Sequence, residues 1–89
     1  MIKQNITIIN KLGLHARAAS KLVNCASRFE SEVLIGRNGN QVNAKSIMGV
    51  MMLAASKGVE LELEVFGNDE QVCQQAITDL INNRFGEDE

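Results

Sequence analysis

The segment from Val59 to Gly67 restricts the fold more than any other part of the sequence. It reads VELELEVFG, in which apolar residues (Val59, Leu61, Leu63 and Val65) alternate with three glutamates. An alternation of period two places the apolar side chains on one face of a strand and the glutamates on the other. Such a strand suits an antiparallel sheet of which one face is covered and the other is wet. The rest of the chain must therefore supply the cover.

Three further segments are predicted to be strands of the same sheet. Residues 1–9 alternate apolar and polar side chains in a similar way. Residues 31–37 form a strand around a short apolar run, and Asn38 and Gly39 directly after it form the dipeptide most typical of a two-residue β-hairpin. A return strand over residues 41–43 completes that hairpin.

Two helices are predicted from the spacing of apolar residues and from helix-end residues. Between residues 16 and 27 apolar side chains recur at i, i+3, i+4 and i+7, which is the spacing of one helical face. A second, shorter helix is predicted from Ser46 to about Ala55, with Gly58 as its C-terminal stop.

A third helix is predicted to begin at Asn68, because Gln71 three residues later completes a capping box. Gly86 is expected to end it, and its buried stripe is expected to consist of Cys73, Ala76, Ile77 and Leu80. The element order is then βαββαβα. We predict a single α+β domain over residues 1–89, with a four-stranded antiparallel sheet covered on one face by three helices.

The composition argues against several classes of function. The net charge is −2 and no basic cluster is present, so we expect no nucleic-acid partner. The chain has three Phe and no Trp or Tyr, which leaves no aromatic platform for single-stranded nucleic acid. No stretch approaches the roughly 20 apolar residues of a membrane span, and the N-terminus lacks the apolar region of a signal peptide. We therefore expect no membrane insertion.

The cysteines and the histidine do not suggest a metal site. Cys25 and Cys73 lie far apart and form no C-x-x-C motif, and His15 is the only histidine. One histidine without a cluster of further ligands cannot fill a metal site, so we expect no metal and no cofactor. Both cysteines are most simply small buried hydrophobic residues in a reduced, cytoplasmic setting.

His15 and Arg17 lie at the start of the helix predicted over residues 16–27. The first backbone N–H groups of a helix have no intrahelical partner, so they form an anion site to which Arg17 adds a guanidinium suited to phosphate. His15 could bind an anion there, or be phosphorylated itself. The alternative is a surface histidine in a loop where Gly13 merely permits the turn. Acid–base catalysis is disfavoured, because no carboxylate lies near His15 in the sequence to orient its ring.

Ser46 is expected to be the N-cap of the second helix. An N-cap serine contributes about 1 kcal/mol, and this purely structural role is the simplest interpretation. Phosphorylation at the same position would be tolerated, because no acidic residue follows in the first turn to repel the added charge.

The second helix carries more apolar surface than a small domain can bury. Exposed Met and Ile are typical of adaptable partner-binding surfaces, and Leu14 would extend such a surface if the two helix starts are adjacent. The predicted docking residues are Leu14, Ile47, Met48, Met51 and Met52. The alternative is that these side chains simply thicken the core.

Two blocks of this sequence together resemble one protein family. They are GLHARAASKLV at residues 13–23 and KSIMGVMMLAASKG at residues 45–58. The pair resembles the HPr family, the histidine-containing phosphocarriers of the phosphoenolpyruvate-dependent phosphotransferase system. The resemblance extends over essentially the whole chain, including its length and the βαββαβα order.

The resemblance implies a cytoplasmic phosphocarrier with an open-faced β-sandwich fold, rather than an enzyme. His15 would accept phosphate through Nδ1 from the phosphoenolpyruvate-dependent first enzyme and pass it to sugar-specific A components, and Arg17 would assist. Ser46 matches the position modified by an ATP-dependent HPr kinase/phosphorylase. Ile47, Met48 and Met51 would belong to the docking face. We expect the carrier to be a monomer.

One position departs from the family pattern. The family usually has proline directly after the arginine, where this chain has Ala18. Alanine is an excellent helix former, so we expect the helix to form without it. Two alternatives to a sugar-system carrier stay open: a carrier of the nitrogen-related, regulatory branch, and a regulatory binding module that does not turn over phosphate.

Overall fold

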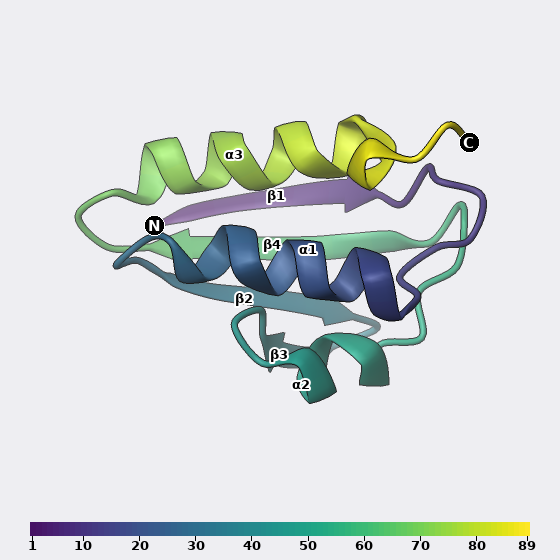
Figure 1. Ribbon diagram of the computed structural model, residues 1–89. Coiled ribbons are helices and arrows are strands. Elements are labelled where there is room, and N and C mark those ends of the chain that lie inside the picture. Colours follow the sequence, from purple (N-terminus) through teal and green to yellow (C-terminus); the bar gives the residue numbers. More distant parts are fainter.

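The computed structural model describes residues 1–89 and has the predicted βαββαβα order (Figure 1). Its elements are β1 (Ile2–Thr7), α1 (Ala16–Ser27), β2 (Glu32–Arg37), β3 (Asn40–Asn43), α2 (Ile47–Met52), β4 (Glu60–Phe66), α3 (Glu70–Asn82) and the 3-10 turn η1 (Arg84–Gly86). The four strands form one antiparallel sheet in the order β1-β4-β2-β3.

The alternating segment forms β4, an interior strand of the sheet. Leu61, Leu63 and Val65 are buried, whereas Glu60 and Glu62 are exposed. Leu63 lies opposite Gln4 of β1 and Ile35 of β2 in the two antiparallel registers. The prediction of a sheet with one covered and one wet face is therefore confirmed at its centre.

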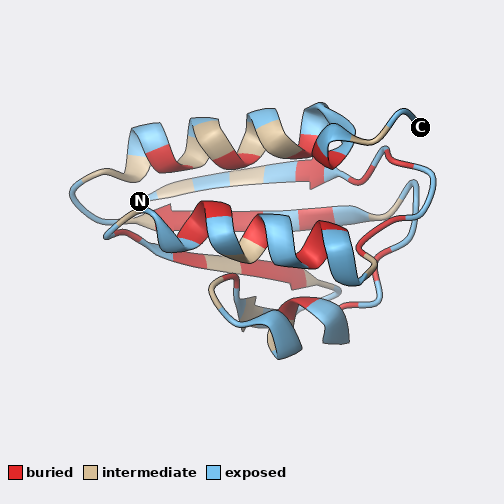
Figure 2. Cartoon of the chain, viewed as in Figure 1, coloured by how far each residue is buried: buried red, intermediate tan, exposed pale blue.

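The helices cover one face of this sheet (Figure 1). α1 and α3 run roughly along the direction of the strands, and α2 lies beside β3 (Figure 1). Buried residues recur along α1, α3 and β4 (Figure 2). Both cysteines belong to the core, and burial raises the pKa of Cys73 to about 11, so its thiol stays neutral. None of the helices is both long and apolar enough to span a membrane.

The turn between β2 and β3 is the predicted two-residue hairpin. Asn38 has φ 54° and Gly39 has φ 85°. Two successive positive φ values define a type I′ turn, whose twist matches that of the flanking strands. The local sequence was sufficient here because the turn depends on these two residues alone.

α2 is shorter than predicted. It ends at Met52 rather than near Ala55, since Ala54 adopts φ +50° and leaves the helical conformation. The guanidinium of Arg37, in β2, donates hydrogen bonds to the carbonyls of Leu53 and Ala54 at 3.1 and 3.0 Å. These bonds satisfy carbonyls that the helix end leaves without partners. Gly58 is not the helix stop; it lies in the turn that leads into β4.

α3 also differs from the prediction at both ends. Its N-cap is Asp69 rather than Asn68, so the predicted capping box with Gln71 does not form. The helix ends at Asn82, before the separate turn that contains Gly86. Of the predicted stripe, Cys73 and Ile77 are buried and Ala76 and Leu80 are half-buried, while Ile81 is a buried member that was not predicted.

The Asp69 carboxylate does not cap its own helix but binds the turn between α1 and β2. It accepts hydrogen bonds from the backbone N–H groups of Glu30 and Ser31, both at 2.9 Å, and from the Ser31 hydroxyl. These bonds, that of the hydroxyl above all, hold the pKa of Asp69 below its ordinary value of 3.8. Asp69 therefore fastens the start of α3 to a segment 38 residues away.

We expect Asp69→Asn to lower the free energy of unfolding at neutral pH. The difference in free energy of unfolding between the wild type and the variant should become smaller at acidic pH. Because the folded chain holds the Asp69 proton less tightly than the unfolded chain, the contribution of this carboxylate is present above pH 4 or so and is lost as the pH falls through its lowered pKa. Urea unfolding at several pH values measures the gap. Asp79→Asn, on the exposed face of α3, is the matched control; a gap of equal size there would contradict the assignment.

Candidate functional site

His15 is the N-cap residue of α1, but its side chain does not cap the helix. Its backbone is extended (φ −75°, ψ 176°), and its carbonyl accepts the first helical hydrogen bond from Ala19 N–H at 2.8 Å. The N–H groups of Ala16, Arg17 and Ala18 therefore have no acceptor at the start of the helix. The ring is left available beside an unpaired, electropositive helix end. Ala18, where the family that the sequence resembles usually has proline, is buried within α1, which forms over Ala16–Ser27.

The loop that presents His15 is packed against the segment that follows α2. Gly13 has φ +68°, and a Cβ atom on it would lie 2.6 Å from the carbonyl oxygen of Ala55. Leu14 N–H donates a hydrogen bond to the same carbonyl at 2.8 Å. Both the conformation and the close approach thus require glycine at position 13. The turn at Gly13 therefore has a defined conformation that packs against the chain after α2, and is not a surface loop in which glycine only permits the turn.

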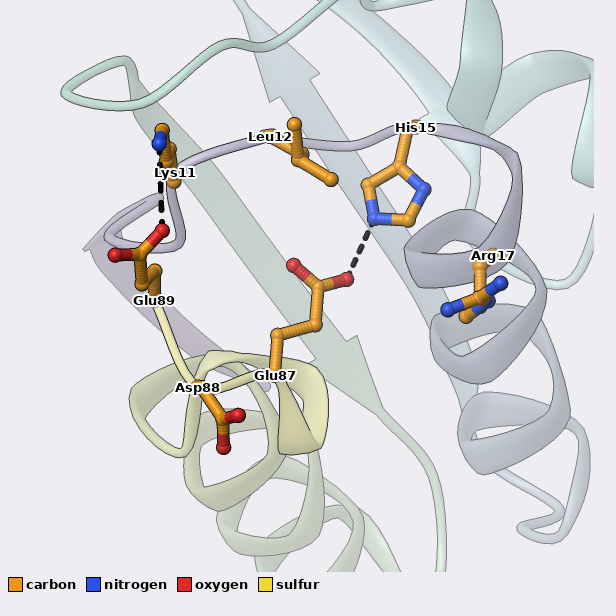
Figure 3. Close-up of a pocket in the computed structure, with 7 residues that line it drawn as sticks. All are labelled: Lys11, Leu12, His15, Arg17, Glu87, Asp88 and Glu89. Atoms are coloured by element: carbon orange, nitrogen blue, oxygen red, sulfur yellow. Dashed lines mark hydrogen bonds and ion pairs between the residues drawn. The ribbon is translucent and has the colours of Figure 1, made fainter.

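A pocket of about 470 Å³ opens beside the His15 ring (Figure 3). Its lining residues are Lys11, Leu12, His15, Arg17, Glu87, Asp88 and Glu89. Lys11 Nζ is paired with Glu89 Oε2 at 3.3 Å, whereas Arg17 is exposed and forms no ion pair with any of the three acids. Arg17 is therefore the cation of the pocket whose charge is left for an incoming anion. Leu12, which the sequence did not single out, contributes an exposed apolar side chain.

The structure brings a carboxylate to the His15 ring, although none lies near His15 in the sequence. Glu87 Oε2 lies 2.5 Å from His15 Nε2, although the two residues are 72 positions apart. Glu87 Oε1 accepts a hydrogen bond from Asn10 Nδ2 at 3.0 Å. The hydrogen bonds from Asn10 and His15 hold the pKa of Glu87 below its ordinary value, so this carboxylate is ionised at neutral pH.

Ser46 is the N-cap of α2, as predicted. Its hydroxyl accepts a hydrogen bond from Gly49 N–H at 3.3 Å, and the residue is exposed. No acidic residue lies in the first turn of α2. Ser46 does not line the His15 pocket, so the structure keeps these two predicted sites separate.

α2 exposes most of the predicted docking residues. Its buried side is formed by Val50, with Leu53 just after the helix, while its outward apolar residues are Ile47, Met48, Met51 and Met52, which we call the α2 patch. Leu14 is only 6% exposed and belongs to the core, so the prediction that it extends an exposed surface is wrong. Its backbone packs against the chain after α2, which turns the side chain inward.

Comparisons with known proteins agree with this geometry. Residues 2–83 match the family model described as the PTS HPr component phosphorylation site. A phosphocarrier protein HPr of Neisseria meningitidis is 60% identical over 89 residues, with both chains covered completely. A crystal structure of HPr from Thermoanaerobacter tengcongensis superposes with a TM-score of 0.96 at 44% identity, again with both chains covered completely. A crystal structure described as an HPr dimer from the same organism gives 0.79 at 45% identity, covering 98% of this chain and 100% of that one.

Proposed function

The chain belongs to the HPr family and is a phosphoryl carrier of the phosphotransferase system, and from that premise we propose that His15 carries the phosphate. It is a phosphocarrier protein rather than an enzyme, and its partners are enzymes of the phosphotransferase system. The observation that supports His15 is its position at the open N-terminus of α1, beside a pocket that also contains Arg17. A phosphate on the ring would lie next to unpaired N–H donors and a free guanidinium.

The proposed acceptor atom is Nδ1 of His15. Nε2 faces the Glu87 carboxylate at 2.5 Å, so phosphate can join that nitrogen only by displacing Glu87. Nδ1 is on the opposite side of the ring from Glu87 (Figure 3). An imidazole whose proton is on one nitrogen keeps a lone pair on the other, which makes Nδ1 the nucleophile.

Labelling with phosphoenolpyruvate tests this proposal. The chain is incubated with phosphoenolpyruvate and the first enzyme of the phosphotransferase system, and its intact mass is measured. We expect a gain of one phosphate that is lost in acid, as a phosphohistidine is. A chain that gains no phosphate, or an acid-stable one, would overturn the assignment of His15.

We expect Arg17→Ala to slow phosphoryl transfer about tenfold, below the 10²–10³ lost with a buried preorganised donor, because Arg17 is exposed. The transfer rate of Arg17→Lys should lie between those of the wild type and Arg17→Ala, since lysine keeps the positive charge but loses the bidentate donor geometry. Single-turnover transfer from the phosphorylated first enzyme measures the rates. Arg28→Ala removes the same charge from the other end of α1; equal rates in Arg17→Ala and Arg28→Ala would contradict a role for Arg17.

The proposed partners are the first enzyme and the A components, and the α2 patch is the proposed docking face. The patch groups one Ile and three Met side chains that the core does not use. Flexible Met side chains suit a surface that must fit several partners in turn. We further propose that residues 1–89 act as a single cytoplasmic domain and as a monomer; the single domain is supported by one continuous core of 21 buried residues.

Ser46 is the proposed site of regulatory phosphorylation, supported by its exposure and by the absence of acidic residues in the first turn of α2. Incubation with ATP and an HPr kinase/phosphorylase should add an acid-stable phosphate that Ser46→Ala abolishes and Ser56→Ala retains. Ser46→Ala should also cost about 1 kcal/mol of stability through the lost cap. An unchanged label in Ser46→Ala would leave Ser46 as a structural cap only.

A further inference from the structure

The C-terminal segment is fastened over the His15 ring at two points on either side of Glu87. Before it, Phe85 is fully buried and its carbonyl accepts a hydrogen bond from Lys21 Nζ at 2.6 Å. After it, the carbonyl of Glu89 accepts a hydrogen bond from Lys11 N–H at 2.9 Å. Anchors on both sides hold the Glu87 side chain in place, so its contact with His15 does not depend on a loose tail.

Asn10 ties Glu87 to the loop that presents His15. This residue is fully buried, and its amide nitrogen donates to Glu87 Oε1 at 3.0 Å and to the carbonyl of Gly13 at 2.8 Å. Both amide protons are thereby used, one on the C-terminal segment and one on the loop. The position of the carboxylate and the position of the ring are set by the same buried side chain.

The contact between Glu87 and His15 determines which ring nitrogen carries the proton. An ionised carboxylate accepts hydrogen bonds but cannot donate them. The proton shared at 2.5 Å therefore belongs to Nε2, and the neutral ring has its lone pair on Nδ1. The arrangement is that of other carboxylate–histidine pairs, in which the acid fixes the tautomer and orientation of the imidazole and stabilises its cation.

We propose that Glu87 is a positioning residue of the phosphoryl transfer: it holds the Nε2 proton of His15 before, during and after the phosphate is on Nδ1. This inference rests on the proposed role of His15. In the accepting step the Nδ1 lone pair forms the new N–P bond while the bond from phosphorus to the donor breaks and its electron pair leaves with the donor. In the giving step the N–P bond breaks and its pair returns to Nδ1.

The Nε2 proton is not transferred in either direction, so neither step needs a further acid or base. While the phosphate is on Nδ1, the ring with its Nε2 proton is a cation, and the Glu87 carboxylate lies against it. Because the ring keeps its Nε2 proton, breaking the N–P bond releases a neutral imidazole rather than an imidazolate anion, and neutral imidazole is the better leaving group. This is the property that a relay between two partners requires.

The inference is tested with Glu87→Ala and Glu87→Gln, and with Asp88→Asn as the matched control. Asp88 lines the same pocket, and its replacement removes the same charge without breaking a contact to the ring. We expect the maximal single-turnover rate of acceptance from the phosphorylated first enzyme to fall about tenfold in Glu87→Ala, with an unchanged KM, and to fall less in Glu87→Gln. Nitrogen-15 NMR should show an Nε2 proton that exchanges slowly with water in the wild type and Asp88→Asn, and rapidly in Glu87→Ala.

Three results would overturn the inference: an unchanged rate in Glu87→Ala, an equal loss in Asp88→Asn, or a loss confined to KM. The first means that Glu87 does not act on transfer, the second that only the charge of the pocket matters, and the third that Glu87 acts in docking. The proposed function fails separately, when the wild-type chain does not gain phosphate on His15. Labelling of the wild type by the first enzyme is therefore measured in the same series.

Discussion

His15→Ala should abolish the acid-labile phosphate completely. The variant lacks the imidazole that attacks phosphorus, and the chain has no second histidine to replace it. The backbone of α1 should be unaffected, since the His15 side chain makes no capping hydrogen bond and alanine keeps the extended N-cap conformation accessible. Intact mass after incubation with phosphoenolpyruvate and the first enzyme measures the loss.

The control for His15→Ala is to show that the variant is still folded. The variant should unfold cooperatively in urea, with a stability close to that of the wild type, because His15 is not part of the hydrophobic core and its side chain loses one contact, that with Glu87. It should also still bind the first enzyme, so an excess of it should inhibit transfer to the wild type. A folded His15→Ala chain that gains an acid-labile phosphate would show that another residue is the acceptor.

Phe85→Ala should have the largest effect on stability, about 3–5 kcal/mol, the usual cost of truncating a fully buried aromatic side chain. Phe85 is completely buried although it lies in the short turn η1, only four residues from the C-terminus. It connects α3 to the segment that covers His15, so the variant loses core packing and the anchor of Glu87 together. Urea unfolding of the wild type and the variant gives the difference.

Phe66→Ala is the matched control for Phe85→Ala. Phe66 closes β4 and is only half-buried, so its loss should cost clearly less. Phe85→Leu should recover most of the stability, because leucine refills much of the same volume. A cost below about 1 kcal/mol for Phe85→Ala would mean that the C-terminal segment is not a packed part of the fold.

Much of the fold could be predicted because its signals are local. The alternation of β4, the apolar face of α1 and the Asn38-Gly39 turn each depend on residues adjacent in sequence, and the structure has all three. The C-terminal end of α2 and the start of α3 could not be predicted in the same way. They depend on Arg37 and Asp69, whose decisive hydrogen bonds join segments distant in the chain.

The residues of the candidate site also differ in whether local sequence could predict them. His15 and Arg17 could be found because the start of α1, which gives them their chemistry, can be predicted from the residues next to them in the sequence. Glu87 could not, since its contact with His15 spans 72 positions and arises only when the chain after α3 folds back over the ring. Leu14 was misplaced for a related reason: its burial depends on the chain after α2 rather than on its own neighbours.

The position of the phosphate on the ring tests the role of His15 most directly. The chain is labelled with nitrogen-15 histidine, phosphorylated with phosphoenolpyruvate and the first enzyme, and examined by phosphorus and nitrogen NMR. We predict a phosphorus–nitrogen coupling at Nδ1 of His15, with the proton retained on Nε2 beside Glu87. A coupling at Nε2, or a phosphate on any other residue, would contradict the assignment of Nδ1 of His15 as the acceptor.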